Sequence, residues 1–167
     1  MRLLTLVRHA KSSWDQPGQR DFDRPLNERG ERDAPRMAAH VRRMAGTPDA
    51  IVSSPALRAL TTARVFAEAM DLPAARIVEQ PRIYEASAAT LLELVRQFDD
   101  GLRHIMMFGH NPGFSELAHA LAPVSFEDLS TCAAVQIGFD VARWAEIQQG
   151  RGAQHFYAYP KQFKQQT

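Results

Sequence analysis

Three apolar segments of the sequence each end in residues suited to binding or transferring an anion. Arg8 and His9 follow the first segment, Arg58 follows the second, and His110 follows the third. A neutral imidazole is a competent nucleophile toward phosphorus, and a guanidinium binds phosphate oxygens through paired N–H groups. If the three segments lie side by side, these residues place two guanidiniums and two imidazoles around one tetrahedral anion.

Each of these motifs also has a simpler interpretation when it is taken alone. Arg8 and His9 suit a solvated loop, Arg58 suits the exposed face of a helix, and His110 suits a histidine that hydrogen-bonds to the backbone. The first turn of a helix does favour an anion near Arg58, because backbone N–H groups and the helix dipole point there. The chemical interpretation therefore depends on the elements that position the motifs.

Strands and helices are predicted to alternate along most of the chain. Residues 3–7 and 50–52 are short apolar runs without polar alternation, which is typical of strands buried on both faces. Residues 76–78 and 104–108 are predicted to form a third and a fourth strand. Between and after them, apolar residues recur at helical spacing, and a helix is predicted over about residues 56–70. The N-caps predicted for the other helices are Asn27, Ser87 and Asn111, the last followed by Pro112 at the first helical position.

Three less regular segments complete the prediction. Residues 10–25 contain turn-forming residues and no apolar period, so we expect a loop without regular structure, and long loops of this kind are often functional. Residues 134–139 alternate between apolar and polar types, which predicts a strand nearer the edge of the sheet, and a last strand is predicted over residues 155–159. The tail after Pro160 is expected to be loosely held.

This order of elements predicts the fold class. Alternating strands and helices with right-handed crossovers form an α/β protein, here a three-layer α/β/α sandwich with a mostly parallel central sheet. We expect one domain over residues 1–167. In such sheets, ligands bind beyond the carboxyl ends of the strands, so the three motifs are expected to converge on one site.

Composition narrows the classes of partner and compartment. The chain is 45% hydrophobic and 23% charged, as is usual for a globular domain, and its net charge is only +1. No global field favours nucleic acid, and residues 3–7 are too short for a signal peptide or a membrane span. The single Cys132 cannot form an intrachain disulfide, which suits a reducing compartment. We therefore expect a cytoplasmic protein without nucleic-acid or membrane partners.

The three motifs resemble the signature blocks of a known family. The segments LVRHA (residues 6–10), SSPALRALTTA (residues 53–63) and GHNP (residues 109–112) are similar to those of the histidine phosphatase superfamily, which includes the phosphoglycerate mutases and the SixA-type phosphohistidine phosphatases. The resemblance extends from residue 3 to about residue 121, and it implies a phosphoglycerate mutase-like fold. It is specific because three blocks occur in order, each at the end of a predicted strand.

The resemblance implies a role for each residue of the core motifs. His9 would attack phosphorus and become transiently phosphorylated, while Arg8, Arg58 and His110 would bind the phosphoryl oxygens and stabilise charge in the transition state. Water would then release inorganic phosphate, and neither a metal nor a cofactor is required. The two guanidiniums favour the unprotonated form of His9 that attack requires.

Four further residues receive roles at the same site. Arg24 matches an arginine that SixA-type members present to the anion, and Ser12 and Asn111 are assigned to substrate binding. Glu85 falls where many members carry the carboxylic acid that protonates the leaving group, although an exposed glutamate before a helix is an equally good interpretation. An imidazole that leaves from phosphohistidine depends less on such an acid than an alkoxide does.

Departures from the family pattern bear on the substrate. Mutase-like members carry Gly, Glu and Asn where this chain has Ala10, Lys11 and Asp15, which argues against sugar-phosphate specificity. Only 52 positions separate Arg58 from His110, so no large lid insertion is expected. An open site of this kind admits a phosphohistidine displayed on another protein, and it also admits small phosphate esters.

Other readings of the sequence find less support. The pair of acidic residues in Asp21-Phe22-Asp23 is similar to that of haloacid dehalogenase-type phosphatases, but no apolar strand precedes it. Cys132 lacks the arginine six positions later that a cysteine phosphatase needs, and the histidines show no metal-ligand spacing. Trp14 is interpreted as a packing residue or as part of the rim of the site.

Three functions remain open at the level of sequence. The first is a SixA-like phosphatase acting on phosphohistidine in a phosphorelay or phosphocarrier protein. The second is a phosphomonoesterase of broad specificity for small phosphate esters. The third is a module that binds phosphorylated ligands without turnover, which the presence of both imidazoles and both core arginines disfavours.

Overall fold

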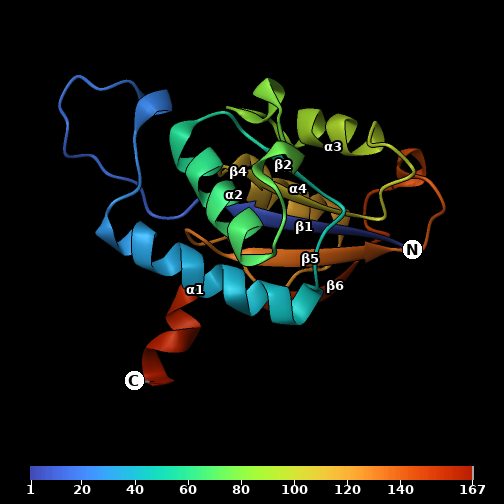
Figure 1. Cartoon of the computed structure of the whole chain (residues 1–167). Coiled ribbons are helices and arrows are strands. Elements are labelled where there is room, and N and C mark those ends of the chain that lie inside the picture. Colours follow the sequence, from blue (N-terminus) through green and yellow to red (C-terminus); the bar gives the residue numbers. More distant parts are fainter. Residues whose placement is uncertain (167) are drawn as a thin grey trace.

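The computed structural model describes residues 1–166, in which strands and helices alternate over most of the chain (Figure 1). The strands are β1 (Arg2–Arg8), β2 (Ala50–Ser53), β3 (Ile77–Glu79), β4 (His104–Gly109), β5 (Ala134–Phe139) and β6 (Ala153–Ala158). The α-helices are α1 (Glu28–Ala45), α2 (Leu57–Ala69), α3 (Ala88–Arg96) and α4 (Gly113–Leu121). Short 3-10 helices are η1 (Asp21–Asp23), η2 (Ala74–Arg76), η3 (Pro81–Ile83), η4 (Trp144–Glu146) and η5 (Pro160–Gln166).

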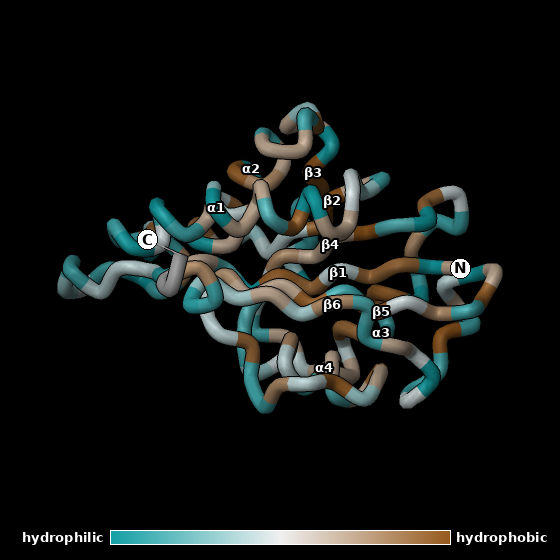
Figure 2. Tube along the Cα trace, turned by 90° about the horizontal axis from the view of Figure 1, so that it is seen from below, coloured by the Kyte–Doolittle hydropathy of each residue, from teal (hydrophilic) through white to brown (hydrophobic). Residues whose placement is uncertain are grey.

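The strands form one sheet with the order β3-β2-β4-β1-β5-β6. Neighbours from β3 to β1 are parallel, while β5 is antiparallel to both β1 and β6. Helices α1 and α2 pack on one face of the sheet and α3 and α4 on the other, as Figure 2 shows. The predicted three-layer α/β/α sandwich with a mostly parallel central sheet is therefore confirmed.

The sheet separates two apolar cores. Along β4, Ile105 and Met107 belong to the core that includes α3 and α4, and Met106 and Phe108 belong to the core that includes α1 and α2. All four side chains are fully buried. Burial on both faces explains why these strands read as continuous apolar runs. Because helices pack on both faces of the sheet, the relative positions of the strand ends are also fixed.

Two predicted helix caps are confirmed and a third is displaced. The side chain of Asn27 accepts a hydrogen bond from the N–H of Gly30 at the start of α1, and that of Ser87 accepts one from Thr90 at the start of α3. Helix α4 begins one residue later than predicted, because Pro112 is its N-cap and not its first helical residue.

The prediction that residues 134–139 form a strand nearer the edge of the sheet is confirmed, because β5 lies between β1 and the edge strand β6. All six of its residues are nevertheless buried. Its polar residue Gln136, which made the segment alternate, is satisfied inside the sheet by donating to the Thr5 hydroxyl at 3.2 Å. The C-terminal segment forms η5, and the ring of Phe163 lies 4.9 Å from the ring of His40. A loosely held tail stays a prediction.

The predicted loop over residues 10–25 contains more structure than expected. Ser12 pairs with Leu26 in an isolated bridge, and the N–H of Ser13 donates to the Pro25 carbonyl at 2.8 Å. The 3-10 helix η1 also falls within it. Figure 1 shows the first half of this loop projecting from the body of the molecule, in blue.

The chain between α2 and β4 contains η2, β3, η3 and α3 and no large lid insertion, as predicted. The carboxyl ends of the parallel strands therefore stay uncovered by an extra helical layer. Among the described residues, none of the helices combines the length and apolar character that crossing a membrane requires.

Candidate active site

The carboxyl ends of β1, β4 and β2 lie side by side, because β4 pairs with both of the other strands. Arg8 pairs with Gly109, so His9 and His110 follow at the same level, and their ring centroids are 5.3 Å apart. The charge of Arg58, in the first turn of α2, acts on both imidazoles. The structure thus brings together the four residues of the core motifs.

One ring nitrogen of His9 is held by a hydrogen bond, and the other has a free lone pair. The side chain is 6% exposed, and Nδ1 lies 2.7 Å from the carbonyl oxygen of Ala10. A carbonyl only accepts hydrogen bonds, so Nδ1 carries the proton and Nε2 carries the lone pair. Burial is the main cause that lowers the pKa of His9 to about 3, and His110, Arg58 and Arg8 act in the same direction. At neutral pH the ring is therefore neutral, and the lone pair on Nε2 is what a nucleophile requires.

Hydrogen bonds from two other elements fix the backbone around His9. The buried Thr62 on α2 accepts from the N–H of Ala10 at 3.0 Å and donates to the carbonyl of Arg58 at 2.8 Å. The N–H of Cys132 donates to the His9 carbonyl at 3.0 Å. The Thr62 hydroxyl therefore links the loop after β1 to the first turn of α2, which fixes the spacing of the two motifs.

Three buried nitrogen atoms at this site have no hydrogen-bond partner among the described residues, namely Arg8 Nε, Arg58 Nε and His110 Nδ1. Leaving a buried polar group unpaired costs about 1–3 kcal/mol, and such groups are rare. Arg58 is only 5% exposed, so solvent does not readily replace the missing partner. Guanidinium N–H groups are strong donors to phosphate oxygens, and their convergence beside His9 indicates an anion site.

Asp21 fixes the orientation of Arg58. Its backbone carbonyl accepts from Arg58 Nη1 at 2.6 Å, and its carboxylate accepts from Nη2 at 2.9 Å. The same carboxylate accepts from the hydroxyl of Tyr84 at 2.7 Å. Although partial burial raises the pKa of Asp21, hydrogen bonds from Tyr84, Arg58 and Arg24 lower it to about 2. A permanently charged Asp21 thus holds both terminal nitrogens of Arg58 and leaves Nε for the anion.

Arg24 lies beside this group and is tied to the loop. Its Nε donates to Asp21 at 3.1 Å, and Nη1 donates to the Ser12 hydroxyl at 2.8 Å. Its guanidinium stacks 3.5 Å from the ring centroid of Trp14, which is 73% exposed. The charge of Arg24 also acts on His110. Ser12 therefore orients Arg24, and direct contact of either residue with substrate stays a prediction.

Asn111 is engaged in bonds within the protein. Its Nδ2 donates to the Leu129 carbonyl at 2.8 Å, and its Oδ1 accepts from the hydroxyl of Ser115 at 2.7 Å. The same Leu129 carbonyl accepts from Arg8 Nη1 at 3.0 Å. Asn111 thus joins α4 to the segment that supports Arg8, and its assignment to substrate binding stays a prediction.

Glu85 lines a cavity of about 440 Å³ that His110 also borders. The remaining walls come from the start of α3 and the turn before α4. Glu85 adopts a φ of 59°, a left-handed conformation that is uncommon for residues other than glycine. The cavity borders His110, so a group that occupies it would lie next to one of the two imidazoles of the site. A role for Glu85 as acid stays a prediction.

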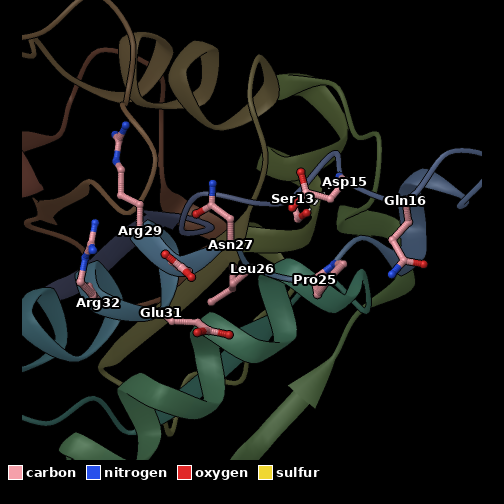
Figure 3. Close-up of a pocket in the computed structure, with 10 residues that line it drawn as sticks. Ser13, Asp15, Gln16, Pro25, Leu26, Asn27, Arg29, Glu31 and Arg32 are labelled. Atoms are coloured by element: carbon pink, nitrogen blue, oxygen red, sulfur yellow. Dashed lines mark hydrogen bonds between the residues drawn. The ribbon is translucent and has the colours of Figure 1, made fainter.

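A second cavity, of about 560 Å³, lies beyond the motifs. Figure 3 shows that its lining comes from the loop around Ser13 and Gln16 and from the stretch between Pro25 and Arg32. No imidazole lines it, and its charged groups are carboxylates as well as guanidiniums. This cavity therefore lacks the groups that phosphoryl transfer requires, despite being the larger of the two.

The three buried imidazoles predict that the protein loses stability in mild acid. Burial lowers the pKa of His9 to about 3 and that of His104 and His110 to about 4, from an ordinary value of 6.5. Below pH 6.5 the unfolded chain binds protons that the folded protein does not, so stability is complete above that pH and falls as the pH drops toward 4. We expect a lower urea midpoint at about pH 5 than at about pH 7.5. An equal or higher midpoint at the lower pH contradicts the burial of neutral imidazoles.

Asp21, Tyr84 and Thr62 are site residues that reasoning from sequence did not assign. Asp21 and Arg58 are 37 positions apart, and the chain carries no local pattern that pairs them. The local signal is an acidic residue in a loop near the motifs, and in the sequence Asp21 resembles instead one member of the acidic pair of a different phosphatase type. Within residues 1–166, no three His, Cys, Asp or Glu side chains form a group that could hold a metal ion.

Comparison with solved structures shows the same fold in phosphatases. A crystal structure from Agrobacterium tumefaciens, described as a candidate phosphohistidine phosphatase SixA, matches with a TM-score of 0.79 and 27% identity over 95% of this chain and 99% of that one. A protein histidine phosphatase SixA complexed with tungstate matches with a TM-score of 0.77 and 21% identity over 97% and 99%. A mycobacterial glucosyl-3-phosphoglycerate phosphatase shares the fold at a TM-score of 0.64 and 18% identity over 89% and 96%.

Sequence comparison gives the family. An uncharacterized chloroplastic protein of Arabidopsis thaliana is 33% identical over 87% of this chain and 70% of its own length. An uncharacterized protein of Mycobacterium tuberculosis is 31% identical over 88% of this chain and 95% of its own length. The family model of the histidine phosphatase superfamily (branch 1) matches residues 4–100. With the fold and the clustered motifs, this match establishes that the chain belongs to the histidine phosphatase superfamily and is a phosphatase.

Proposed function

We propose that the protein hydrolyses phosphohistidine on another protein, such as a phosphorelay or phosphocarrier protein, through a phosphorylated His9. The observation that carries the proposal is the neutral, buried His9 with a free Nε2, on which the charges of Arg8 and Arg58 act while the Nε atoms of both arginines lack a partner among the described residues. This arrangement supplies a nucleophile and a preorganised cationic pocket in the same place.

The first step transfers the phosphoryl group to His9. The lone pair of Nε2 forms a bond to phosphorus while the bond from phosphorus to the leaving group breaks. Arg8, Arg58 and His110 bind the phosphoryl oxygens and offset the charge that they carry in the transition state. The leaving imidazole or alkoxide departs with the bonding pair and takes a proton, which Glu85 or water supplies.

The second step regenerates the enzyme. Water attacks phosphorus, the bond from phosphorus to Nε2 breaks, and its electron pair returns to His9. The proton that water loses passes to a base or to solvent, and inorganic phosphate dissociates. Because its Nδ1 stays bonded to Ala10, the ring of His9 returns to the same tautomer for the next cycle.

Two features support a protein substrate. The strand ends carry no large lid, so a phosphorylated side chain displayed on a folded partner has access. The cavity of about 440 Å³ beside His110 is within the range of pockets that hold small-molecule or side-chain-sized groups. The likeness to the SixA structure from Agrobacterium tumefaciens is consistent with this assignment.

The alternative substrates are small phosphate esters. Replacing Glu85 is expected to slow their hydrolysis more than that of phosphohistidine. Alkoxides are poor leaving groups, so we expect Glu85→Gln to lower kcat on an alkyl phosphate by about 100-fold, the lower end of what a general acid contributes. Hydrolysis of a phosphohistidine peptide should fall less than about fivefold, because imidazole leaves more readily. Glu68→Gln, which makes the same change on an exposed part of α2, is the control. Equal losses on both substrates would show that Glu85 does not distinguish small phosphate esters from phosphohistidine.

A substrate panel tests the proposed function as a whole. Phosphohistidine proteins, sugar phosphates and p-nitrophenyl phosphate are compared at matched concentrations with a chelator present. We expect the highest kcat/KM on phosphohistidine and no effect of the chelator. Higher kcat/KM on small esters would favour the phosphomonoesterase, and binding without turnover on any substrate would favour the ligand-binding module. Activity that the chelator abolishes would overturn the metal-independent mechanism.

A further inference from the structure

Ser54 contacts His110 from the end of β2 and has no part in the mechanism described so far. Its side chain is fully buried, and its Oγ lies 2.8 Å from Nε2 of His110. The same Oγ accepts a hydrogen bond from the N–H of Ala56 at 3.2 Å. The partner of the other ring nitrogen is missing, since Nδ1 of His110 is buried and unpaired among the described residues.

The direction of the bond between Ser54 and His110 follows from counting donors and acceptors. A hydroxyl has one proton to donate, and a buried hydroxyl is rarely left with that proton unpaired. The N–H of Ala56 only donates, so the Nε2 atom of His110 is the one acceptor that the described contacts offer to the Ser54 proton. The Ser54 hydroxyl therefore donates to Nε2, and the ring proton of neutral His110 resides on Nδ1.

We propose that Ser54 is a positioning residue that fixes His110 as the Nδ1–H tautomer, so that a neutral imidazole donates a hydrogen bond to the transferred phosphoryl group. The proposal rests on the proposed function, because it assigns the phosphoryl oxygen as the missing partner of Nδ1. It explains why Nδ1 is buried without a partner beside two guanidinium Nε atoms in the same condition.

The two imidazoles then have opposite roles set by their neighbours. A carbonyl that only accepts holds the proton of His9 on Nδ1 and leaves a lone pair on Nε2 for attack. A hydroxyl that donates occupies the lone pair of His110 at Nε2 and leaves a proton on Nδ1 for the phosphoryl oxygen. With the opposite tautomer, Nδ1 of His110 would present a lone pair to an anion and repel it.

The backbone around Ser54 holds the hydroxyl in reach of His110. The N–H of Ser54 donates to the Phe108 carbonyl at 3.0 Å, which continues the pairing between β2 and β4 up to the motif. The hydroxyl of Ser53 donates to the Ser54 carbonyl at 2.9 Å. Because Ser53 is equally buried but its described hydroxyl contact is to the Ser54 carbonyl, it offers a matched control.

The test of the positioning role is a mutant cycle. Ser54→Ala should lower kcat by about 10- to 100-fold, the loss seen when a functional histidine loses its orienting partner, whereas Ser53→Ala should lower it less than about threefold. In a His110→Ala background, Ser54→Ala should change kcat less than about twofold, because the residue through which it acts is gone. An equal loss from Ser54→Ala in both backgrounds would show that the serine serves only the fold, and would overturn the proposal.

A spectroscopic measurement on the unmutated protein decides the tautomer, and a variant is needed only to assign the signals. Nitrogen-15 NMR of labelled imidazoles near neutral pH, with the His110 signals assigned by their loss in His110→Ala, should show a protonated Nδ1 and an unprotonated Nε2. A protonated Nε2 would overturn the proposal. Because this readout needs no turnover, it remains decisive if the substrate panel shows no hydrolysis and the proposed function fails.

Discussion

Replacing His9 by Ala is expected to lower kcat by at least about 10⁴-fold on every substrate while inorganic phosphate still binds. The loss follows because, among the described residues, Nε2 of His9 is the neutral nitrogen of the site that keeps a free lone pair when Ser54 donates to His110 as proposed. Binding survives because Arg8 and Arg58 supply their unpaired Nε donors independently of His9.

Two measurements check this expectation. Rapid acid-free quenching of the native enzyme with a labelled substrate should trap an acid-labile, alkali-stable phosphoryl group that His9→Ala cannot form. Calorimetry with inorganic phosphate should give dissociation constants within about tenfold for the two proteins. His155→Ala, on the exposed edge strand β6, is the control for loss of a histidine. Turnover by His9→Ala above about 1% of native would mean that another residue is the nucleophile.

Replacing Arg58 by Ala is expected to lower kcat/KM by about 10³-fold, near the upper end of what one transition-state donor contributes. Arg58 is 5% exposed, and its Nε faces the anion site while Asp21 holds its terminal nitrogens. The variant also removes one of the two guanidiniums that contact the Asp21 carboxylate and leaves only that of Arg24, so weaker neutralisation of this carboxylate adds to the loss.

Arg58→Lys separates geometry from charge. Lysine keeps the positive charge, but a single ammonium cannot hold the two oxygens of Asp21 and also present a donor in place of Nε. We therefore expect Arg58→Lys to recover less than about tenfold of the lost kcat/KM. Arg64→Ala, an exposed arginine of the same helix, is the control. Recovery by lysine to within about threefold of native would show that charge alone suffices.

Most of the scaffold was predictable because it follows local rules. Strand β4 was recognisable as an unbroken apolar run because both faces of the sheet are covered, and Asn27 marked the start of α1 because its side chain caps that helix. Strand β5 was placed correctly near the edge of the sheet, but its full burial follows from no local rule. Its Gln136 reads as a solvent-facing residue, yet it is paired inside the sheet with Thr5, a partner 131 positions away.

The active site also has features that local sequence rules predict and features that they do not. The sequence by itself determined which residues are the candidates for the chemistry, because Arg8, His9, Arg58 and His110 sit in motifs at the ends of apolar segments, and parallel strands end on one edge. It also determined the family and the absence of a large lid, since both follow from the motifs and the number of residues between them.

Only the tertiary structure decided how those residues are set for reaction. The partner of each nitrogen lies on another element, as when Asp21 in the first loop holds Arg58 on α2 and Ser54 after β2 holds His110 after β4. The burial that lowers the pKa of His9 to about 3 likewise depends on packing that only the folded sandwich provides. Residue type and spacing specify what each group is able to do, but tautomer, charge state and orientation depend on neighbours that the fold brings from distant parts of the chain.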